Sequence, residues 1–387
     1  MAIETSCDET AVCLLEAHGG IENAEFRILG NALYSQASLH SAYGGVYPSL
    51  AKREHQANLA PLATEALAEA KMLSPRVADD LIYQVISDKI RDDSFRNTIQ
   101  KFISDYAKPD IDLIAVTKGP GLEPALWTGI NFAEALGSAW NIPVIGIDHM
   151  EGHIVSALLT PAHKTESYKL EAVSFPVLAL LISGGHTELV VSKKLFAYEH
   201  IGRTKDDAVG EAFDKVARLL DFPYPGGPEI ANAASRSRKR GEAHGITFPR
   251  PMAHDDTCDF SFSGLKTAVL YKLRDMEKID EADKEHIAEA FEDAARDVIV
   301  IKTRRALETT AAAMLVVGGG VSANSEIRNA LKKLIEDEFP TVTLAFPDQS
   351  LTGDNAVMIG AAGYLRSLQE EKNHDNLSAL GNLKLAQ

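Results

Sequence analysis

The sequence predicts an α/β protein built from two domains. Strand-like apolar runs alternate with stretches of helical periodicity, and the 387 residues fit about two domains of ordinary size. Two segments also share one pattern. Residues 2–13 and 177–190 each show a strand, a small polar turn and a second strand. This repeat predicts a duplicated domain, with a ligand expected in the cleft between the copies.

The individual elements are predicted from apolar runs bounded by turn residues. We expect strands at 11–16, 112–117, 143–147, 177–182, 188–192, 314–317 and 342–346. We expect helices at 50–71, 125–139, 207–220, 265–276, 285–310 and 324–338. The stretch 73–109 combines mixed charge with weak periodicity, which indicates a peripheral insertion of helical character. Residues 275–297 are acidic with apolar residues at helical spacing, which is typical of a helix with a solvated face.

Composition excludes several classes of protein. The chain is 45% apolar and 24% charged, and no apolar run approaches the roughly 18 residues that span a bilayer. Its 55 acids and 39 bases give a net charge of −16, which repels polyanions, so a nucleic-acid partner would need a local basic patch. The three cysteines, Cys7, Cys13 and Cys258, lack C-x-x-C spacing, so we expect neither disulfides nor a thiolate zinc site. We therefore expect the protein to reside in a reducing compartment. Because the first strand-like run begins at residue 2, we expect no signal peptide or presequence in this sequence.

Two histidines form a candidate metal site. His149 and His153 are four residues apart, so on a helix they point the same way and can share one ion. The alternative is two unrelated histidines on one helix. A metalloprotease needs glutamate directly after the first histidine, where this chain has Met150, so a protease is disfavoured. Asp354 before the last helix is either an N-cap or a third ligand.

Two glycine-rich turns are candidates for phosphate binding. The Ser183-Gly184-Gly185 turn follows a strand and lets backbone N–H groups approach a phosphate, although a plain hairpin turn fits equally. The run 314–324 is a buried-type strand, three glycines and a helix start with G-x-G-x-x-A spacing. Because it lies late in the chain, it favours a nucleoside near this backbone over a nicotinamide. Asp214 lies too far into its helix to compensate the dipole, and a rigid turn at 224–228 follows it.

Nine ordered segments carry a resemblance to a known family. They are 3–10 (IETSCDET), 43–48 (YGGVYP), 117–122 (TKGPGL), 149–153 (HMEGH), 183–187 (SGGHT), 210–215 (GEAFDK), 260–267 (FSFSGLKT), 318–324 (GGGVSAN) and 353–355 (GDN). The chain resembles the universal tRNA N6-adenosine threonylcarbamoyltransferases, once called O-sialoglycoprotein endopeptidases, over nearly its whole length apart from 73–109. Its resemblance is closest to the mitochondrial fungal member.

The resemblance implies the actin, sugar-kinase and Hsp70-like (ASKHA) fold with two duplicated RNase H-like domains around a nucleotide cleft. We expect one domain over 1–146 plus 355–387 and the other over 147–354. The resemblance also implies one divalent ion, iron or zinc, held by His149, His153 and Asp354. The implied nucleotide-binding residues are Leu181, Ile182, Ser183, Gly184, Gly185, Asp214, Gly227, Gly319 and Asn324.

The implied activity is an acyl-type transfer in tRNA modification. The threonylcarbamoyl group of threonylcarbamoyl-AMP, made by a separate synthase, would pass to N6 of adenosine 37 (t6A) in tRNAs that read codons beginning with A. An exocyclic adenine amine is a poor nucleophile, so the rate must come from activating the acyl group and aligning the reactants. Asp8 and Glu9 are candidates for catalytic contacts, with no general base assigned. A small-molecule kinase of the same fold and a metal-dependent peptidase are the alternatives.

The resemblance extends to partners and location. The partner is the tRNA anticodon loop, whose unpaired base can be splayed into a pocket. A homodimer in the mitochondrial matrix is expected, with a bacterial-type cytoplasmic enzyme that needs accessory proteins as the alternative. The one strongly basic run comprises Arg236, Arg238, Lys239 and Arg240, which we interpret either as a solvated loop or as a patch that contacts tRNA phosphates. Residues 277–297 hold nine acids and three bases and need not face RNA.

Overall fold

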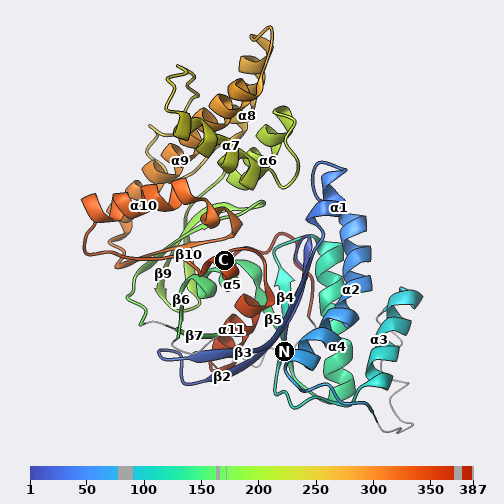
Figure 1. The fold of residues 1–387 in the computed structure, drawn as a ribbon. Coiled ribbons are helices and arrows are strands. Elements are labelled where there is room, and N and C mark those ends of the chain that lie inside the picture. The colour runs from blue at the N-terminus through green and yellow to red at the C-terminus, as the bar shows by residue number, and fades with distance from the viewer. Residues whose placement is uncertain (77–89, 163–165, 171, 370–376, 386–387) are drawn as a thin grey trace. The chain divides into compact units, whose positions relative to one another are not determined.

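The computed structural model describes residues 1–76, 90–162, 166–170, 172–369 and 377–385, and it is α/β as predicted (Figure 1). The described residues form two compact units. Unit 1 comprises Met1–Ala37, Val46–Ala172 and Asp354–Leu385; unit 2 comprises Ser38–Gly45 and Val173–Gly353. Among the described residues, no helix has the length and apolar character needed to cross a membrane.

Unit 1 is built on a seven-stranded sheet of order β5-β4-β1-β2-β3-β7-β6. Its strands are β1 (Ala2–Glu4), β2 (Glu9–His18), β3 (Glu25–Ser35), β4 (Ile114–Gly119), β5 (Val144–Asp148), β6 (Leu159–Pro161) and β7 (Ser167–Leu170). Its longer helices are α2 (Pro48–Glu69), α3 (Asp93–Asp105), α4 (Glu123–Trp140), α5 (His149–Ala157) and α11 (Ala356–Ser367), and the short α1 (Ala37–Ser41) begins where the chain passes into unit 2.

Alternating side chains of the sheet in unit 1 pack against helices on its two faces. Val12 and Leu14 of β2 belong to the core beneath α2 and α4. The intervening positions face α11, where Gly360 lies against Leu15 of β2 and Gly363 against Ala115 of β4. A Cβ at Gly363 would lie 2.6 Å from the Cβ of Ala115, so only glycine allows α11 to approach the sheet this closely. This approach fixes where the segment just before α11 lies.

Unit 2 contains a five-stranded sheet of order β10-β9-β8-β11-β12. Its strands are β8 (Val177–Ile182), β9 (Thr187–Lys194), β10 (Ala197–Arg203), β11 (Met314–Gly318) and β12 (Thr343–Ala345). Its helices are α6 (Val209–Leu219), α7 (Gly226–Arg240), α8 (Ser263–Arg274), α9 (Glu281–Thr310) and α10 (Ser325–Glu338), with 3-10 turns η1 (Gly320–Ala323) and η2 (Gln349–Leu351). Phe213, Phe260, Phe262 and Phe291 are fully buried in its core.

The two units repeat one topology. The run β3-β2-β1-β4-β5 in unit 1 corresponds to β10-β9-β8-β11-β12 in unit 2. In both, each of the first three strands runs antiparallel to its neighbour, and the last two strands run parallel to the central strand. The predicted duplication and its two hairpins are therefore present, and the arrangement agrees with the expected ASKHA class.

The division of the chain differs from the expected one. We expected the second domain to begin at residue 147, but the chain stays in unit 1 up to residue 172. The physical reason is that α5 follows β5 without a linker and packs against α11, while β6 and β7 extend the first sheet. Helices α5 and α11 therefore both belong to unit 1, which contains all three predicted metal ligands.

The acidic segment forms a helix with apolar residues at helical spacing on one face, as predicted. It begins as α9 at Glu281, where Asp280 and Asp283 form a capping box. Its apolar face, including Ile287 and Phe291, is buried in unit 2. The predicted insertion does contain α3, while residues 77–89 lie outside the described residues.

Replacing Gly363 with alanine tests the close packing of α11 on the sheet. We expect the overpacking to cost about 1–3 kcal/mol, which outweighs the roughly 1 kcal/mol that alanine gains as a helix former. Urea denaturation measures the loss. The control is Gly264→Ala in α8, where an added Cβ meets only Pro251 Cγ at 3.7 Å. Equal stability of the two variants would contradict the packing argument.

Candidate metal centre

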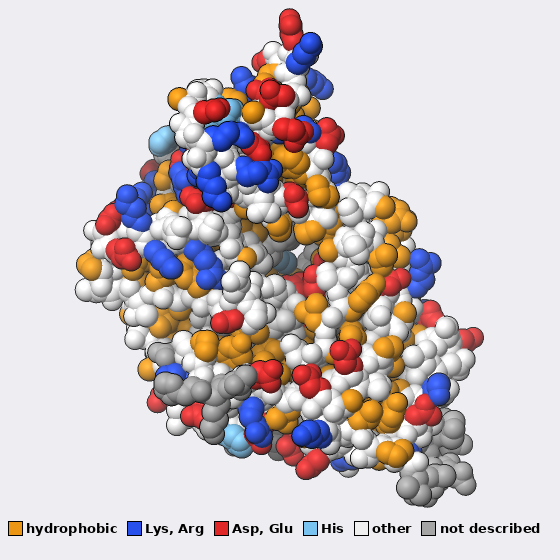
Figure 2. Space-filling model, viewed as in Figure 1, with side chains coloured by type: hydrophobic (Ala, Val, Ile, Leu, Met, Phe, Trp, Pro, Cys, Tyr) orange, Lys and Arg blue, Asp and Glu red, His pale blue; other side chains and the backbone are white. Residues whose placement is uncertain are grey.

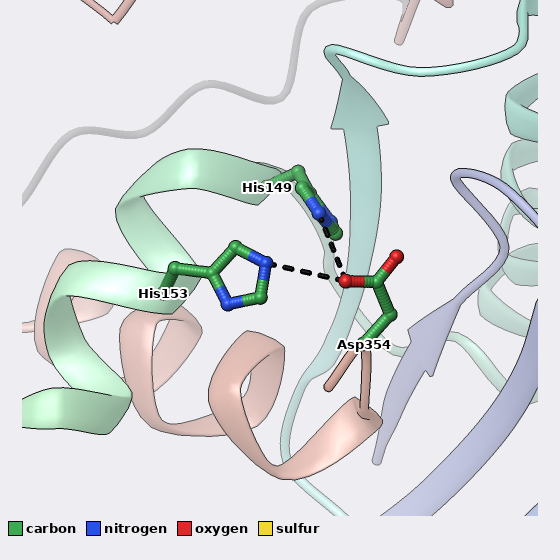
Figure 3. Close-up of side chains that lie close together, drawn as sticks. All are labelled: His149, His153 and Asp354. Carbon is green, nitrogen blue, oxygen red and sulfur yellow. Dashed lines mark ion pairs between the residues drawn. The ribbon is translucent and has the colours of Figure 1, made fainter. Parts of the chain in front are cut away.

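The two predicted histidine ligands lie on α5, which starts where β5 ends. Asp148 caps this helix by accepting hydrogen bonds from the backbone N–H groups of Met150 at 2.8 Å and Glu151 at 3.3 Å. Burial, followed by the charge of Glu151, raises the pKa of Asp148 to about 6. His149 and His153 are one helical turn apart and both are buried, and their rings point to the same side of the helix (Figure 3).

The third predicted ligand, Asp354, lies next to the two histidines although it is far from them in the sequence. Asp354 lies two residues before the first residue of α11, and one of its carboxylate oxygens lies 3.3 Å from Nε2 of His149 and 3.2 Å from Nε2 of His153 (Figure 3). The alternative role of N-cap belongs to Asn355, whose side chain accepts from Met358 N at 2.9 Å. One ligand atom from each of His149, His153 and Asp354 fits within a group of atoms no more than 4.8 Å apart.

The hydrogen bonding of these side chains fits a bound cation. His153 is fully buried, and within the described part of the chain neither of its ring nitrogens has a hydrogen-bond partner. An unsatisfied buried imidazole is costly, and coordination by one nitrogen would relieve that cost. Two imidazole nitrogens and a carboxylate oxygen are ligands that zinc and iron both accept.

The electrostatics of the group favour positive charge. Burial has the largest effect on the pKa of Asp354 and would raise it, but the charges of His149 and His153 and their close contacts with the carboxylate hold it well below its ordinary value. Burial likewise opposes the charged form of His149, yet Asp354 and Glu4 together raise its pKa well above the ordinary value. In His153 burial dominates and lowers the pKa. Two carboxylates therefore surround a place where a cation is stabilised.

Asp8 and Glu9, the predicted catalytic acids, belong to the same unit as the metal group. They lie at the tip of the β1–β2 hairpin, and Ser35 Oγ donates to Glu9 Oε1 at 3.1 Å. Burial, reinforced by the charges of Asp8 and Asp354, raises the pKa of Glu9 to about 9. A raised pKa favours the protonated form, which makes Glu9 a candidate for proton transfer. Its part in catalysis stays a prediction.

The predicted phosphate-binding turns adjoin one another in unit 2. Gly318 of β11 pairs with Leu181 of β8, so residues 181–185 and 318–320 meet where two parallel strands end, the usual ligand edge of an α/β sheet. Gly319 has φ of +89°, and a Cβ there would lie 2.4 Å from the Ile182 carbonyl oxygen. The Cβ positions of Gly184, Gly185 and Gly320 meet open space. Backbone groups are accessible here, as phosphate binding requires.

Two other predicted nucleotide contacts have structural roles. Asp214 Oδ1 accepts from Gly226 N at 2.7 Å and thereby holds the start of α7, next to Gly227. Asn324 caps α10 by accepting from Ile327 N at 3.0 Å, and its amide donates to Glu292 at 2.7 Å. Neither role bears on nucleotide binding, which stays a prediction for both residues.

The basic run at 235–240 forms the end of α7 and not a loop. Arg236 lies 2.5 Å from Glu285, Arg238 contacts Glu292 at 2.6 Å, and Arg240 also pairs with Glu285. Figure 2 shows basic and acidic side chains intermixed in this region. The acids of α9 therefore neutralise three of the four bases, and among the described residues only Lys239 of the run has no ion-pair partner. The tRNA patch stays a prediction with less free charge than the sequence indicated.

The structure adds three site residues that the sequence analysis missed. Glu4 contacts His149 from β1, with Oε2 3.0 Å from Nδ1. Glu151 lies between the two histidines in the sequence of α5, is buried, and receives a bidentate interaction from Arg366 of α11 at 2.8 and 2.5 Å. This second pair ties the helix that carries the histidines to the helix that follows Asp354. The spacing of Glu151 on α5 gave no signal of a partner so distant in sequence.

Substituting Arg366 tests whether this pair holds the two helices together. In Arg366→Met the buried Glu151 loses its cation, and we expect a loss of about 3 kcal/mol in the free energy of unfolding. Arg366→Lys keeps the charge but not the bidentate geometry, so its loss should be smaller. Urea denaturation of the three proteins measures both effects. A methionine variant as stable as the parent would show that the pair contributes nothing.

Comparison with known proteins agrees with the resemblance. The family model described as tRNA N6-adenosine threonylcarbamoyltransferase matches residues 27–79 and 95–361. Proteins of that name from Burkholderia mallei and Burkholderia cenocepacia are 40% identical to this chain over 372 residues, which is 95% of this chain and 91% of each relative.

Two solved structures also match. Full-length HypF in its phosphate- and nucleotide-bound form aligns with a TM-score of 0.49 at 13% identity, over 74% of this chain and 52% of HypF. The ROK hexokinase from Thermus thermophilus aligns with a TM-score of 0.41 at 13% identity, over 92% of this chain and all of the hexokinase. On the family model and the 40% identical relatives, the chain belongs to the tRNA N6-adenosine threonylcarbamoyltransferase family.

Proposed function

We propose that this protein transfers the threonylcarbamoyl group from threonylcarbamoyl-AMP to N6 of adenosine 37 in tRNAs that read codons beginning with A. The observation that carries the proposal is the meeting of His149, His153 and Asp354 in a chain whose family relationship covers nearly all of its length. These residues come from α5 and from the segment before α11, which are far apart in the sequence, and they present a ligand set that the proposed chemistry can use.

The reaction needs help because the adenine amine is a weak nucleophile. A divalent ion bound by Nε2 of His149, Nε2 of His153 and the Asp354 carboxylate would supply a Lewis acid and a template for substrate oxygens. The chain's own residues hold the three ligands on the ends of packed helices, so little reorganisation is needed at the moment of reaction. Its raised pKa makes Glu9 the candidate to hold or deliver a proton at its Oε atoms.

Unit 2 offers groups suited to the adenylate. The backbone N–H groups near Gly184, Gly185 and Gly319 can bind the phosphate that leaves with AMP. Asp214, Gly227 and Asn324 are the further proposed contacts, with Leu181 and Ile182 forming the buried strand end below them. Asp214 already fixes the turn before Gly227, so it would act by shaping that turn as well as by direct contact.

The geometry disfavours the two alternative activities. A kinase holds Mg²⁺ mainly through carboxylates and phosphates, whereas two of the three ligands here are imidazoles. A metallopeptidase needs a free carboxylate as base beside its metal. The carboxylate nearest in sequence, Glu151, is occupied by the guanidinium of Arg366. The transfer reaction makes neither demand.

The metal and the assembly form the finer part of the proposal. We propose iron or zinc as the native ion, a separate synthase as the source of threonylcarbamoyl-AMP, and the anticodon loop as the tRNA contact. A homodimer in the mitochondrial matrix is proposed on the resemblance to the mitochondrial member, with a bacterial-type enzyme assisted by accessory proteins as the alternative. Light scattering of the purified protein distinguishes a dimer from a monomer.

Reconstitution tests the proposed function. The protein alone, given threonylcarbamoyl-AMP and unmodified tRNA, should form the modified nucleoside, measured by mass spectrometry of digested tRNA. His149→Ala, His153→Ala and Asp354→Ala should lose bound metal and on the order of 100-fold or more in rate, because metal stabilisation contributes several kcal/mol. Circular dichroism checks that each variant folds.

The matched control for these variants is His55→Ala. His55 is another buried histidine of unit 1, but it is hydrogen-bonded to Thr10 at 2.7 Å and lies outside the metal group. It should retain metal. Full activity in a metal-free His149 or His153 variant would rule out a catalytic role for the centre. No product from the parent protein, even with metal bound, would show that accessory proteins are required or that the reaction is a different one.

A further inference from the structure

Glu4 is a fully buried carboxylate at the end of β1, and three donors converge on it. The backbone N–H of Ser6 donates to Oε1 at 2.5 Å, and the hydroxyl of Thr117 donates to Oε2 at 2.6 Å. The same Oε2 lies 3.0 Å from Nδ1 of His149. With its neighbours donating, the carboxylate acts only as an acceptor, so the ring nitrogen of His149 facing it must carry a proton.

We infer that Glu4 is a positioning residue for the metal centre, which holds His149 with Nδ1 protonated and Nε2 presented to a divalent cation. This inference rests on the proposed metal-dependent function and adds a residue to it. The opposite ring atom already faces the other ligand, since Nε2 of His149 lies 3.3 Å from the Asp354 carboxylate. A carboxylate behind a ligating histidine fixes its tautomer and raises its basicity.

The two histidines differ in how they are held. His149 has a charged acceptor in Glu4 and a weaker neutral contact with Ser6 Oγ at 3.2 Å. Within the residues that the structure describes, neither ring nitrogen of His153 makes a hydrogen bond, although its Nε2 lies 3.2 Å from the Asp354 carboxylate. The rings lie edge to face with centroids 4.7 Å apart. Glu4 therefore fixes the tautomer of His149, whereas among the described residues no hydrogen bond of this kind fixes His153.

Glutamine at position 4 would disturb this arrangement with almost no change in volume. Its amide has one acceptor oxygen, whereas donors occupy both oxygens of the carboxylate. If the amide oxygen faces His149, the NH2 group opposes the Ser6 N–H. If the NH2 group faces His149, Nδ1 becomes the acceptor and the proton moves to Nε2, the atom that must bind the metal. Either orientation weakens coordination, and the variant also removes a negative charge.

The test measures zinc affinity by competition with a chromophoric chelator, without substrate or tRNA. Glu4→Gln should bind zinc 10- to 100-fold more weakly than the parent, the range typical for residues behind a metal ligand. The cobalt-substituted variant should show a changed visible absorption spectrum. The matched control is Glu292→Gln in unit 2, also buried and accepting from Arg238 and Asn324, which should leave zinc affinity within about twofold of the parent.

Glu4→Asp serves as a second variant in case glutamine prevents folding, which circular dichroism detects. Aspartate keeps the charge but withdraws the carboxylate from His149, so zinc binding should again weaken. The inference is overturned if a folded Gln or Asp variant binds zinc as tightly as the parent with an unchanged cobalt spectrum. It is also overturned if Glu292→Gln weakens binding equally, because the effect would then be general destabilisation. Failure of the parent to bind zinc or cobalt would instead remove the proposed metal centre itself.

Discussion

The packing of α11 between the sheet of unit 1 and α5 is the constraint on which the candidate site depends. The chain returns to unit 1 at Asp354 after the whole of unit 2, and it enters α11 two residues later. Gly363 permits contact with Ala115 of the sheet, and Arg366 donates two hydrogen bonds to the buried Glu151 carboxylate of α5. Because one helix is fixed at both contacts, the residue just before it is delivered to the histidines. A different helix approach would leave an incomplete ligand set.

Buried charge in this region is better explained by function than by stability. Glu4 and His149 are almost wholly removed from water, and Asp354 is four-fifths buried beside them. Burying ions rarely stabilises a fold beyond what apolar side chains of similar size would achieve. Their arrangement instead leaves excess negative charge around two imidazoles and helps to raise the pKa of Glu9. A bound divalent cation would balance the negative charge of these buried carboxylates, so the arrangement suits a protein that binds such an ion.

Features with a local pattern were predictable from the residues themselves. Features that join distant segments were not, apart from Asp354, whose place beside the histidines was implied by the family resemblance. The apolar runs of β8 and β11 and the duplicated hairpins are local, as is the four-residue spacing of His149 and His153. Glu4 is a single acid in a short strand, with its histidine partner 145 residues away, so no periodicity marks it. Arg238 lies in a run that is polar on most faces, and its acidic partners are 54 and 55 residues downstream. Nothing local shows that the chain after β5 stays in unit 1.

The central claim is that His149, His153 and Asp354 form one divalent metal centre. X-ray absorption spectroscopy of the purified, metal-loaded protein tests it most directly, because the fine structure counts ligand types and measures their distances. The claim predicts two imidazole nitrogens and at least one carboxylate oxygen at about 2.0–2.2 Å for zinc. His149→Ala is expected to lose the ion, and any ion that this variant retains should show fewer imidazole nitrogens. A sulfur shell near 2.3 Å, or a spectrum unchanged in that variant, would contradict it.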